Sequence, residues 1–325
     1  MQAGSCSMLS GLVWLSFLGL LLASASLTAG ILWLSVFGEG GMGWLCRVVS
    51  LVYAVWLFYD WDTPSNGVGR RSPLVISIMQ PVFTYAKSCF SSEIIYDCDL
   101  SKLRRDQPLM LGCHPHGICS FAVLSNFSLT GGTILRKHPV SILTLQLQFM
   151  VPLWRELVIA LGFASVSYPS VEARLRAKGD IAIVIGGARE SLDSRPGHIE
   201  LTLRHRTGFF KLALKHGATI LPVLSFGEVD IYHQIRRPWI KKIQIALMQW
   251  MTIAIPLFYS RLWLIPDSTR LTSVVGSPIT VEKAIENPTP EDVKKLQDQY
   301  ISALLSIHQK YNAIVPHGKC SLTIK

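Results

Sequence analysis

Two histidines separated by one proline stand near the middle of the chain, in the segment His114-Pro115-His116-Gly117. An apolar run precedes them, and proline fixes its own φ while Gly117 lets the chain turn sharply. The pattern therefore predicts a strand that ends in a tight turn presenting both rings. Histidine has the unperturbed pKa nearest neutrality, so a general base is its obvious use here. The alternative is a structural turn whose histidines only hydrogen-bond the backbone.

A second segment that could do chemistry is Gly-Gly-Ala-Arg-Glu-Ser at 186–191, directly after a β-branched run at 181–185. Two glycines let a ligand approach the backbone closely, and ligands of open α/β sheets bind outside the carboxyl ends of the strands. Glu190 could orient a histidine and stabilise its protonated form, as carboxylates do in catalytic triads. The alternative is a glycine turn with a solvated pair of Arg189 and Glu190.

Basic residues are concentrated at 203–217, where they open a helix predicted over 209–215 and closed by Gly217. The first turn of such a helix also offers backbone N–H donors, so the segment predicts an anion site. The alternative is a solvated basic face. Glu228 follows a predicted strand at 218–226 through a glycine turn, and by itself this indicates little.

The composition indicates a membrane protein. Half of the 325 residues are hydrophobic and 16% are charged, against about 25% in soluble globular proteins. A net charge of +10 favours anionic lipid headgroups or an anionic ligand, and the sequence has no basic run with interleaved aromatic residues that would indicate nucleic acid. Seven cysteines without CxxC spacing argue against a disulfide scaffold, and their spacing to the histidines matches no zinc pattern, so we expect no metal.

Residues 1–62 are predicted to form a membrane hairpin. An uncharged apolar run at 9–37 is ample for about 30 Å of hydrocarbon, and a shorter run at 44–59 carries only Arg47. Basic residues follow the second run and are missing between the runs, so the positive-inside rule places residues 63–325 in the cytosol. The alternative is a cleaved signal peptide ending near Ala23-Ser24-Ala25, but a basic n-region is missing.

The remainder alternates between strand-like runs and helical patterns, which predicts an α/β domain with a central sheet flanked by helices. Residues 65–73 are interpreted as a polar linker. We expect helices over 74–88 and from Ser170, which would be its N-cap, and an amphipathic helix over 142–163. A membrane-associated helix, re-entrant or interfacial, is expected at about 243–264. The strands expected from their apolar runs are 94–96, 109–111, 164–168, 181–185 and 218–226.

A C-terminal helix is predicted from 291 to about 310. Thr289 is its expected N-cap and Pro290 its first helical residue. One stripe of the helix is apolar and includes Tyr300, and we interpret that stripe as ordinary packing.

Taken together, the segments at 114–117, 186–191, 206–217 and 222–228 resemble the type-2 diacylglycerol acyltransferase family, which includes monoacylglycerol and wax-alcohol acyltransferases. The resemblance runs in unbroken order from about residue 44 to the C-terminus. It implies a glycerolipid-acyltransferase-like core, and transfer of an acyl group from acyl-CoA to the hydroxyl of a neutral lipid, most often diacylglycerol. It implies no metal and no cofactor besides the co-substrate acyl-CoA.

The resemblance also implies roles for particular residues. His114 matches in order the base of the wider glycerolipid acyltransferases, and His116 is the other candidate. Those enzymes place an aspartate five positions after the histidine; here that position holds Cys119 or Phe121, so Glu190 is expected to orient the base, with Glu228 behind it. The residues expected to bind substrate, CoA phosphates included, are Gly117, Gly186, Gly187, Arg189, Ser191, Arg206, Gly208, Phe209, Lys211 and Glu228.

A cysteine nucleophile at Cys113 or Cys119 is the mechanistic alternative. The implied location is the endoplasmic reticulum membrane with a cytosolic catalytic domain, with lipid droplets as a second location and a homo-oligomer left open. Alternative functions are transfer to monoacylglycerol or a long-chain alcohol, and a catalytically silent lipid-binding membrane protein. A lumenal hydrolase is a further alternative, which a glycan on the sequon at Asn126 would support.

Overall fold

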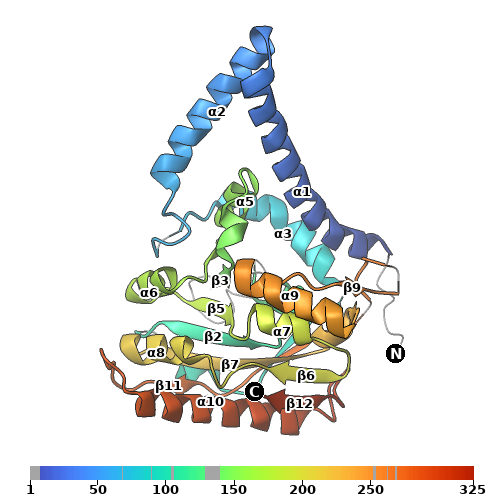
Figure 1. Cartoon of the computed structure of the whole chain (residues 1–325). Helices are drawn as coiled ribbons and strands as arrows, with labels where there is room; N and C mark the ends of the chain where they lie inside the picture. The colour runs from blue at the N-terminus through green and yellow to red at the C-terminus, as the bar shows by residue number, and fades with distance from the viewer. Residues whose placement is uncertain are drawn as a thin grey trace.

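An α/β body carries two long projecting helices (Figure 1). The computed structural model describes residues 8–67, 69–88, 90–103, 106–128, 140–251, 254–261, 263–267 and 269–325. The projecting helices are α1 (Met8–Phe37) and α2 (Gly40–Asp60). A Cβ atom on Gly43 would lie 2.1 Å from the Gly38 carbonyl oxygen, so only glycine permits so tight a turn between them.

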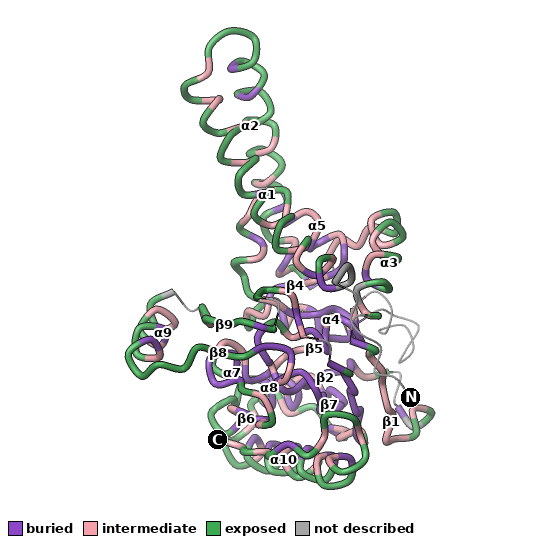
Figure 2. The backbone as a smooth tube through the Cα atoms, turned by 90° about the vertical axis from the view of Figure 1, so that its right-hand side faces the viewer, coloured by how far each residue is buried: buried purple, intermediate pink, exposed green. Residues whose placement is uncertain are grey.

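Both projecting helices are long and apolar enough to cross a membrane, over Gly11–Phe37 and Gly40–Asp60. In the most apolar 18-residue stretch of each helix, only 6% and 11% is buried, respectively. Neither helix is therefore a core helix of the body, and Figure 2 shows both largely exposed. The shorter one has 21 residues, which extend about 31 Å and match a hydrocarbon layer of about 30 Å. The two helices therefore have the length and composition of the predicted hairpin.

The end of α2 is fixed to the body by buried charges. The Arg155 guanidinium donates to a carboxylate oxygen of Asp60 at 2.5 Å and to Glu156 at 2.9 Å, and Arg70 also binds Glu156. The Pro64 carbonyl oxygen accepts a hydrogen bond from the backbone N–H of Ser165 at 3.0 Å. Residues 65–67 and 69–72 form no helix or strand, as expected of a connecting segment, but they pack against the body, where the N–H of Ser72 donates to the Ala160 carbonyl oxygen at 2.9 Å.

The central sheet has the strand order β1-β10-β7-β2-β5-β3-β4, with β11 paired to β7. Strands β7, β2, β5, β3 and β4 are mutually parallel, whereas β10 is antiparallel to β7. The carboxyl ends of β7, β2 and β5 therefore meet at one edge of the sheet. The strands are β1 (Glu93–Tyr96), β2 (Leu109–His114), β3 (Ser141–Thr144), β4 (Ala164–Ser165), β5 (Ile181–Val184), β7 (Thr219–Phe226), β10 (Thr272–Val275) and β11 (Ile279–Thr280).

Both faces of the sheet are covered, so β2 and β7 are buried along their whole length. Met110 of β2 packs on the face covered by α8 (Thr207–His216) and α10 (Pro290–Tyr311), while Leu109 and Leu111 pack on the opposite face. This explains why the strands read as continuous apolar runs rather than alternating patterns. The remaining helices are α3 (Pro73–Ser88), α4 (Phe121–Phe127), α5 (Trp154–Ala160), α6 (Tyr168–Arg176), α7 (Ala188–Asp193) and α9 (Pro238–Met251).

Two smaller sheets and three short helical turns complete the described body. Strand β6 (His198–Leu201) pairs in parallel with β12 (Ser321–Ile324), and β8 (His233–Gln234) pairs antiparallel with β9 (Phe258–Tyr259). The 3₁₀ turns are η1 (Leu100–Lys102), η2 (Gln146–Phe149) and η3 (Glu228–Asp230).

The amphipathic helix predicted over 142–163 is wrong. Ser141 and Ile142 instead pair with β5, a 3₁₀ turn follows, and α5 begins only at Trp154. Strand pairing outweighs the helical spacing here. A continuous helix is also interrupted at Leu153, which follows Pro152 and adopts a positive φ of 65°. The N-cap prediction for Ser170 is also wrong: α6 starts at Tyr168 after Ser167, and the Ser170 hydroxyl donates to the Pro64 carbonyl oxygen. Because α6 already begins at Tyr168, the strand expected at 164–168 is shorter and ends at Ser165.

The single helix expected at about 243–264 is shorter and earlier. Helix α9 spans 14 residues, about 21 Å, after which the chain returns so that β9 pairs with β8. Residues 252, 253 and 262 of the expected range lie outside the described residues. Trp239, Ile243 and Trp250 are exposed on α9, which stands off the body in Figure 2. Its association with a membrane stays a prediction.

Three other helices confirm their predictions. Helix α3 covers the expected 74–88, and α8 ends at Gly217, which adopts a left-handed conformation. In α10 the Thr289 side chain accepts from the N–H of Asp292, whose carboxylate accepts from the N–H of Thr289. This reciprocal cap supplies two partners for unpaired backbone donors.

Candidate active site

His114 is the last residue of β2 and is fully buried. The His114–Pro115 peptide bond is cis, and the chain turns through His116 and Gly117 toward α4. Gly117 has a φ of +58°, and a Cβ atom there would lie 2.4 Å from an oxygen of Glu228. The turn between the histidines and α4 therefore requires glycine at 117 for both conformation and space.

The imidazole of His114 has contrasting surroundings at its two nitrogens. Its Nε2 lies 3.0 Å from the Tyr300 hydroxyl, which donates to the Gly112 carbonyl oxygen at 2.9 Å. Its Nδ1 is buried, has no hydrogen-bond partner in the described part of the chain and lies 4.0 Å from an oxygen of Glu190. Burial lowers the pKa of His114 to about 3, so the ring is neutral at physiological pH.

Glu190 lies in the first turn of α7, after β5, with 2% of its surface exposed. One carboxylate oxygen accepts from the backbone N–H of His116 at 3.0 Å and the other from that of Thr202 at 2.8 Å. Burial raises the pKa of Glu190 to about 7, against the opposing effect of these hydrogen bonds. Gly186 makes the approach possible, because a Cβ atom there would lie 1.8 Å from the carboxyl carbon of Glu190.

Glu228 follows β7 and is equally buried, but it faces α4 rather than the histidine. Its carboxylate accepts from the backbone N–H groups of Phe121 at 3.1 Å and Ala122 at 2.6 Å. Burial raises its pKa to about 8. Glu228 therefore holds the first turn of α4, and through it the histidine turn, without touching either imidazole in the described contacts.

The basic residues expected at the site are arranged unevenly. Arg206 is at the start of α8 and donates to the Gly186 carbonyl oxygen at 2.9 Å, beside Gly187 with its φ of +61°. Arg189 points outward, half exposed, with its Nε 3.8 Å from Asp193. Gly208 and Lys211 are exposed on α8, in agreement with the alternative of a solvated face for this part of the segment.

Three further residues of the expected set have structural contacts. Phe209 is buried with its ring centroid 6.0 Å from that of Tyr300. The Ser191 hydroxyl donates to the Ala188 carbonyl oxygen at 2.9 Å, within α7. His116 is partly exposed, and its Nδ1 lies 3.2 Å from the Gly117 carbonyl oxygen.

Tyr300 is the residue at the site that the sequence interpretation missed. It lies on the stripe of α10 that reads as ordinary packing, and its ring does pack against Phe210 at 5.4 Å between centroids. Its hydroxyl nevertheless meets His114. A tyrosine in an otherwise aliphatic stripe needs a hydrogen-bond partner when buried, which is the only signal that the sequence offers.

An aromatic cluster joins α1 to the histidine turn. Trp14 of α1 packs edge-on against Phe121 with ring centroids 4.8 Å apart, and Phe90 packs against both. Ile118, which directly follows Gly117, belongs to the same cluster. The base of the hairpin is therefore in direct contact with the segment that carries the two histidines.

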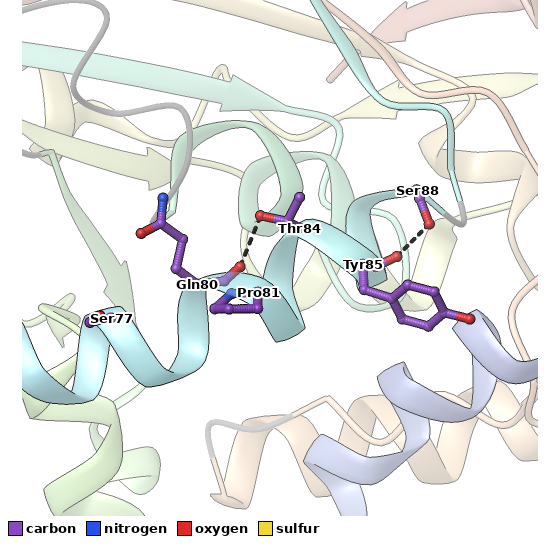
Figure 3. A pocket seen from close by; sticks show the side chains of 6 residues that line it. All are labelled: Ser77, Gln80, Pro81, Thr84, Tyr85 and Ser88. Carbon is purple, nitrogen blue, oxygen red and sulfur yellow. Dashed lines mark hydrogen bonds between the residues drawn. The ribbon is translucent and has the colours of Figure 1, made fainter.

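A groove of about 550 Å³ follows α3, the helix that lies beside α1 (Figure 3). Pro81 stands inside α3 and has no N–H to offer the carbonyl of Ser77 one turn earlier. The groove thus combines side-chain hydroxyl and amide groups with a carbonyl that lacks its helical donor. The lining residues are Ser77, Gln80, Pro81, Thr84, Tyr85 and Ser88.

A basic cleft of about 280 Å³ lies next to α7 at the start of α9. Arg236, Arg237 and Lys241 line it, and Lys241 also pairs with Asp193 at 2.6 Å. Neither Arg236 nor Arg237 forms an ion pair within the part of the chain that the structure describes. The cleft therefore carries uncompensated positive charge beside the helix that holds Glu190.

The cysteines and possible metal ligands have little bearing on the site. Cys113 is fully buried, and burial raises the pKa of its thiol far above the ordinary value, so it stays protonated and is a poor nucleophile. Among the described residues, no three histidine, cysteine, aspartate or glutamate side chains are grouped so that they could hold a metal ion.

Comparison with known proteins identifies the chain's relatives. Residues 43–323 match the family model described as "Diacylglycerol acyltransferase". Human diacylglycerol O-acyltransferase 2 is 35% identical over 82% of this chain and 71% of its own length, and the Dictyostelium discoideum protein of that name is 36% identical over 81% and 82%. Human 2-acylglycerol O-acyltransferase 1 is 35% identical over 80% of each chain.

A solved structure, the 1-acyl-sn-glycerophosphate acyltransferase PlsC from Thermotoga maritima, is similar over 73% of this chain and 79% of its own. Its TM-score is 0.43 and its sequence identity 11%, and a likeness of this size carries no argument.

The α/β body, the buried histidine at the edge of its parallel strands and the family match together define an acyltransferase. The chain belongs to the diacylglycerol acyltransferase family, as the motifs at 114–117 and 186–191 predict.

Proposed function

We propose that this protein transfers a fatty acyl group from acyl-CoA to the hydroxyl of diacylglycerol at a membrane. The observation that carries the proposal is the buried imidazole of His114, whose Nδ1 has no hydrogen-bond partner among the residues that the structure describes and lies beside the carboxylate of Glu190. The names of the relatives, diacylglycerol O-acyltransferase 2 among them, supply the acceptor.

In the proposed reaction, His114 acts as the general base and Glu190 as its electrostatic partner. His114 removes the proton of the acceptor hydroxyl while the oxygen attacks the thioester carbonyl. The ester C–O bond forms, the C–S bond breaks, and the CoA thiolate leaves and takes the proton from the imidazolium. A neutral histidine with a pKa of about 3 is a weak base, so the negative charge of Glu190 must favour the imidazolium as the proton moves.

The groove along α3 and the basic cleft beside α7 suit the lipid acceptor and acyl-CoA, respectively. The groove along α3 lies beside a helix able to cross a membrane and offers hydroxyl, amide and carbonyl groups to a lipid with a free hydroxyl. The basic cleft beside α7 suits the phosphates of acyl-CoA, because Arg236 and Arg237 have no carboxylate partner in the described chain. We assign the acceptor to the groove and the CoA phosphates to the cleft.

The proposed location is the endoplasmic reticulum membrane, with residues 63–325 on the cytosolic side. The positive-inside pattern supports this orientation. A lumenal, glycosylated domain is disfavoured, because Asn126 is fully buried on α4, where it accepts from the Ser92 hydroxyl at 2.7 Å and donates to that of Ser273 at 2.9 Å.

The test is an assay of membranes that contain the protein, supplied with labelled acyl-CoA and diacylglycerol, monoacylglycerol, a long-chain alcohol or no acceptor. Labelled triacylglycerol, lost in the His114→Ala variant with expression and membrane association unchanged, is the expected result. Label chiefly in diacylglycerol would instead assign the monoacylglycerol reaction, which the similarity to 2-acylglycerol O-acyltransferase 1 makes the second candidate. No ester with any acceptor from well-folded protein would refute acyl transfer.

A further inference from the structure

The hydroxyl of Tyr300 connects the proposed base to the backbone of its own strand. Tyr300 and His114 lie 186 residues apart in sequence, on α10 and β2, and both are fully buried. The hydroxyl oxygen is 3.0 Å from His114 Nε2 and 2.9 Å from the carbonyl oxygen of Gly112. Three polar groups therefore share one hydroxyl hydrogen and one ring hydrogen.

Only one arrangement of these hydrogens makes both short contacts hydrogen bonds. A carbonyl oxygen only accepts, so the Tyr300 hydroxyl must donate its hydrogen to Gly112. The hydroxyl oxygen is then left as an acceptor toward His114, and Nε2 must carry a hydrogen to donate to it. A neutral imidazole has one N–H, so Nδ1 is then the bare, basic nitrogen.

We propose that Tyr300 is a positioning residue that keeps the proton of His114 on Nε2 and so makes Nδ1 the atom that accepts the proton of the acceptor hydroxyl. Nδ1 is the nitrogen that faces Glu190, and it is buried with no hydrogen-bond partner among the described residues. In the opposite tautomer, Nδ1 would carry the hydrogen and the lone pair would face the tyrosine. The inference rests on the proposed acyl transfer with His114 as base.

The tyrosine is held so that it cannot easily leave this position. Its ring packs against both Phe209 and Phe210, with centroid distances of 6.0 and 5.4 Å. A Cβ atom on Gly112 would lie 2.1 Å from the hydroxyl oxygen, so the strand accepts the tyrosine only because glycine is there. This fit gives the hydroxyl a fixed place relative to the imidazole, as orientation of a catalytic base requires.

The kinetic test replaces Tyr300 by phenylalanine, which keeps the packed ring and removes only the hydroxyl. We expect kcat to fall about 10- to 100-fold with KM for acyl-CoA unchanged, because the base loses its fixed tautomer while the substrate sites stay intact. The control is Tyr311→Phe, which removes a hydroxyl from the same helix away from His114 and should leave kcat within about twofold. A Tyr300→Phe enzyme with wild-type kcat would overturn the proposal.

A second measurement reads the tautomer without any activity. The protein labelled with ¹⁵N-histidine in detergent gives separate nitrogen shifts for protonated and bare ring nitrogens, and a His114→Gln variant assigns the signals of this ring. We expect a protonated Nε2 and a bare Nδ1 in the wild type, and a mixture of tautomers in Tyr300→Phe. A protonated Nδ1 in the wild type would overturn the inference even if the enzyme were active, whereas the expected shifts in an inactive protein would refute only the proposed acyl transfer.

Discussion

The turns after β5 and β7 are two versions of the same local construction. Each follows a strand adjacent to β2, and each contains a glycine with positive φ, Gly187 or Gly227. Each then presents a glutamate that is 2% exposed and accepts two backbone N–H bonds. They differ in what the carboxylate faces, since Glu190 approaches the imidazole of His114 and Glu228 holds the start of α4.

This difference shows that a buried carboxylate near a histidine is not enough to assign it a role in the reaction. Both glutamates have a pKa raised by burial, to about 7 and about 8, and both are bound to backbone around the histidine turn. Only the position of the first relative to Nδ1 lets its charge act on the proton transfer. A change in one turn, with the matched change in the other as its control, therefore separates the two roles.

The largest effect is expected from Glu190→Gln, which keeps the shape of the side chain and removes its charge. We expect kcat to fall about 100-fold, because the imidazolium that forms on His114 loses its nearby carboxylate. The matched change Glu228→Gln should leave kcat within about threefold, because its neutral form already predominates near pH 7. Equal losses in both variants, measured by initial rates with saturating acyl-CoA, would mean that the two turns are equivalent.

The two glutamates should also differ in their effect on the pH dependence of kcat. The carboxylate form of Glu190 disappears as pH falls through about 7, so kcat should drop roughly fivefold between pH 7 and 6. His114, with its pKa near 3, stays neutral over this range and does not contribute to the limb. The acid limb should vanish in Glu190→Gln and persist in Glu228→Gln. A limb that is unchanged in Glu190→Gln would assign the titration to another group.

The turn after β5 also differs from the turn after β7 in that it leads into α7, which lies beside the basic cleft. Arg236→Ala should raise KM for acyl-CoA about three- to tenfold with kcat little changed, because a charge-assisted phosphate contact is lost. Lys242→Ala is the control, since Lys242 is an exposed cation on α9, the helix that follows Arg236, and lies outside the cleft lining. Acyl-dephospho-CoA, which lacks the 3′-phosphate, tests the contact directly. If Arg236→Ala raised KM equally for acyl-CoA and acyl-dephospho-CoA, Arg236 would not bind the 3′-phosphate.

The smallest effect is one of stability and belongs to Glu228. Its folded-state pKa of about 8 lies above its ordinary value of 4.5, so the folded state binds more protons and stability falls as pH rises between these values. Thermal unfolding in detergent should therefore show a Tm that decreases by a few degrees from pH 5 to pH 8. Glu228→Gln should flatten this slope. A Tm that rises with pH in the wild type, or an unaltered slope in the variant, would contradict the buried carboxylate's role.

Local signals predicted the parts of the molecule that depend on neighbouring residues. The glycine turn at 114–117, the helix closed by Gly217 and the capped helix from Thr289 all depend on backbone preferences or contacts within a few residues. The family resemblance also implied that Glu190 and Glu228 lie near His114. The structure brings the segments after β2, β5 and β7 together because these parallel neighbours end at the same edge.

Contacts between distant segments were beyond such signals. Nothing near Tyr300 indicates that its hydroxyl meets His114, since the helical stripe is the same whether the hydroxyl is bonded or solvated. The strand at Ser141–Thr144 forms because β5 is there to pair with it, which overrides the helical spacing of its own sequence. Nothing in the sequence around Asp60 indicates that Arg155 binds this aspartate.

The clamp at Asp60 and the contact between Trp14 and Phe121 hold the body at both ends of the hairpin. With the hairpin in a bilayer, two attachment points leave the body little freedom to tilt or to rotate about a single stalk. The histidine turn then keeps a constant orientation relative to the bilayer. A lipid acceptor would find the site by lateral diffusion in two dimensions, while acyl-CoA would arrive from the three-dimensional volume of the aqueous phase.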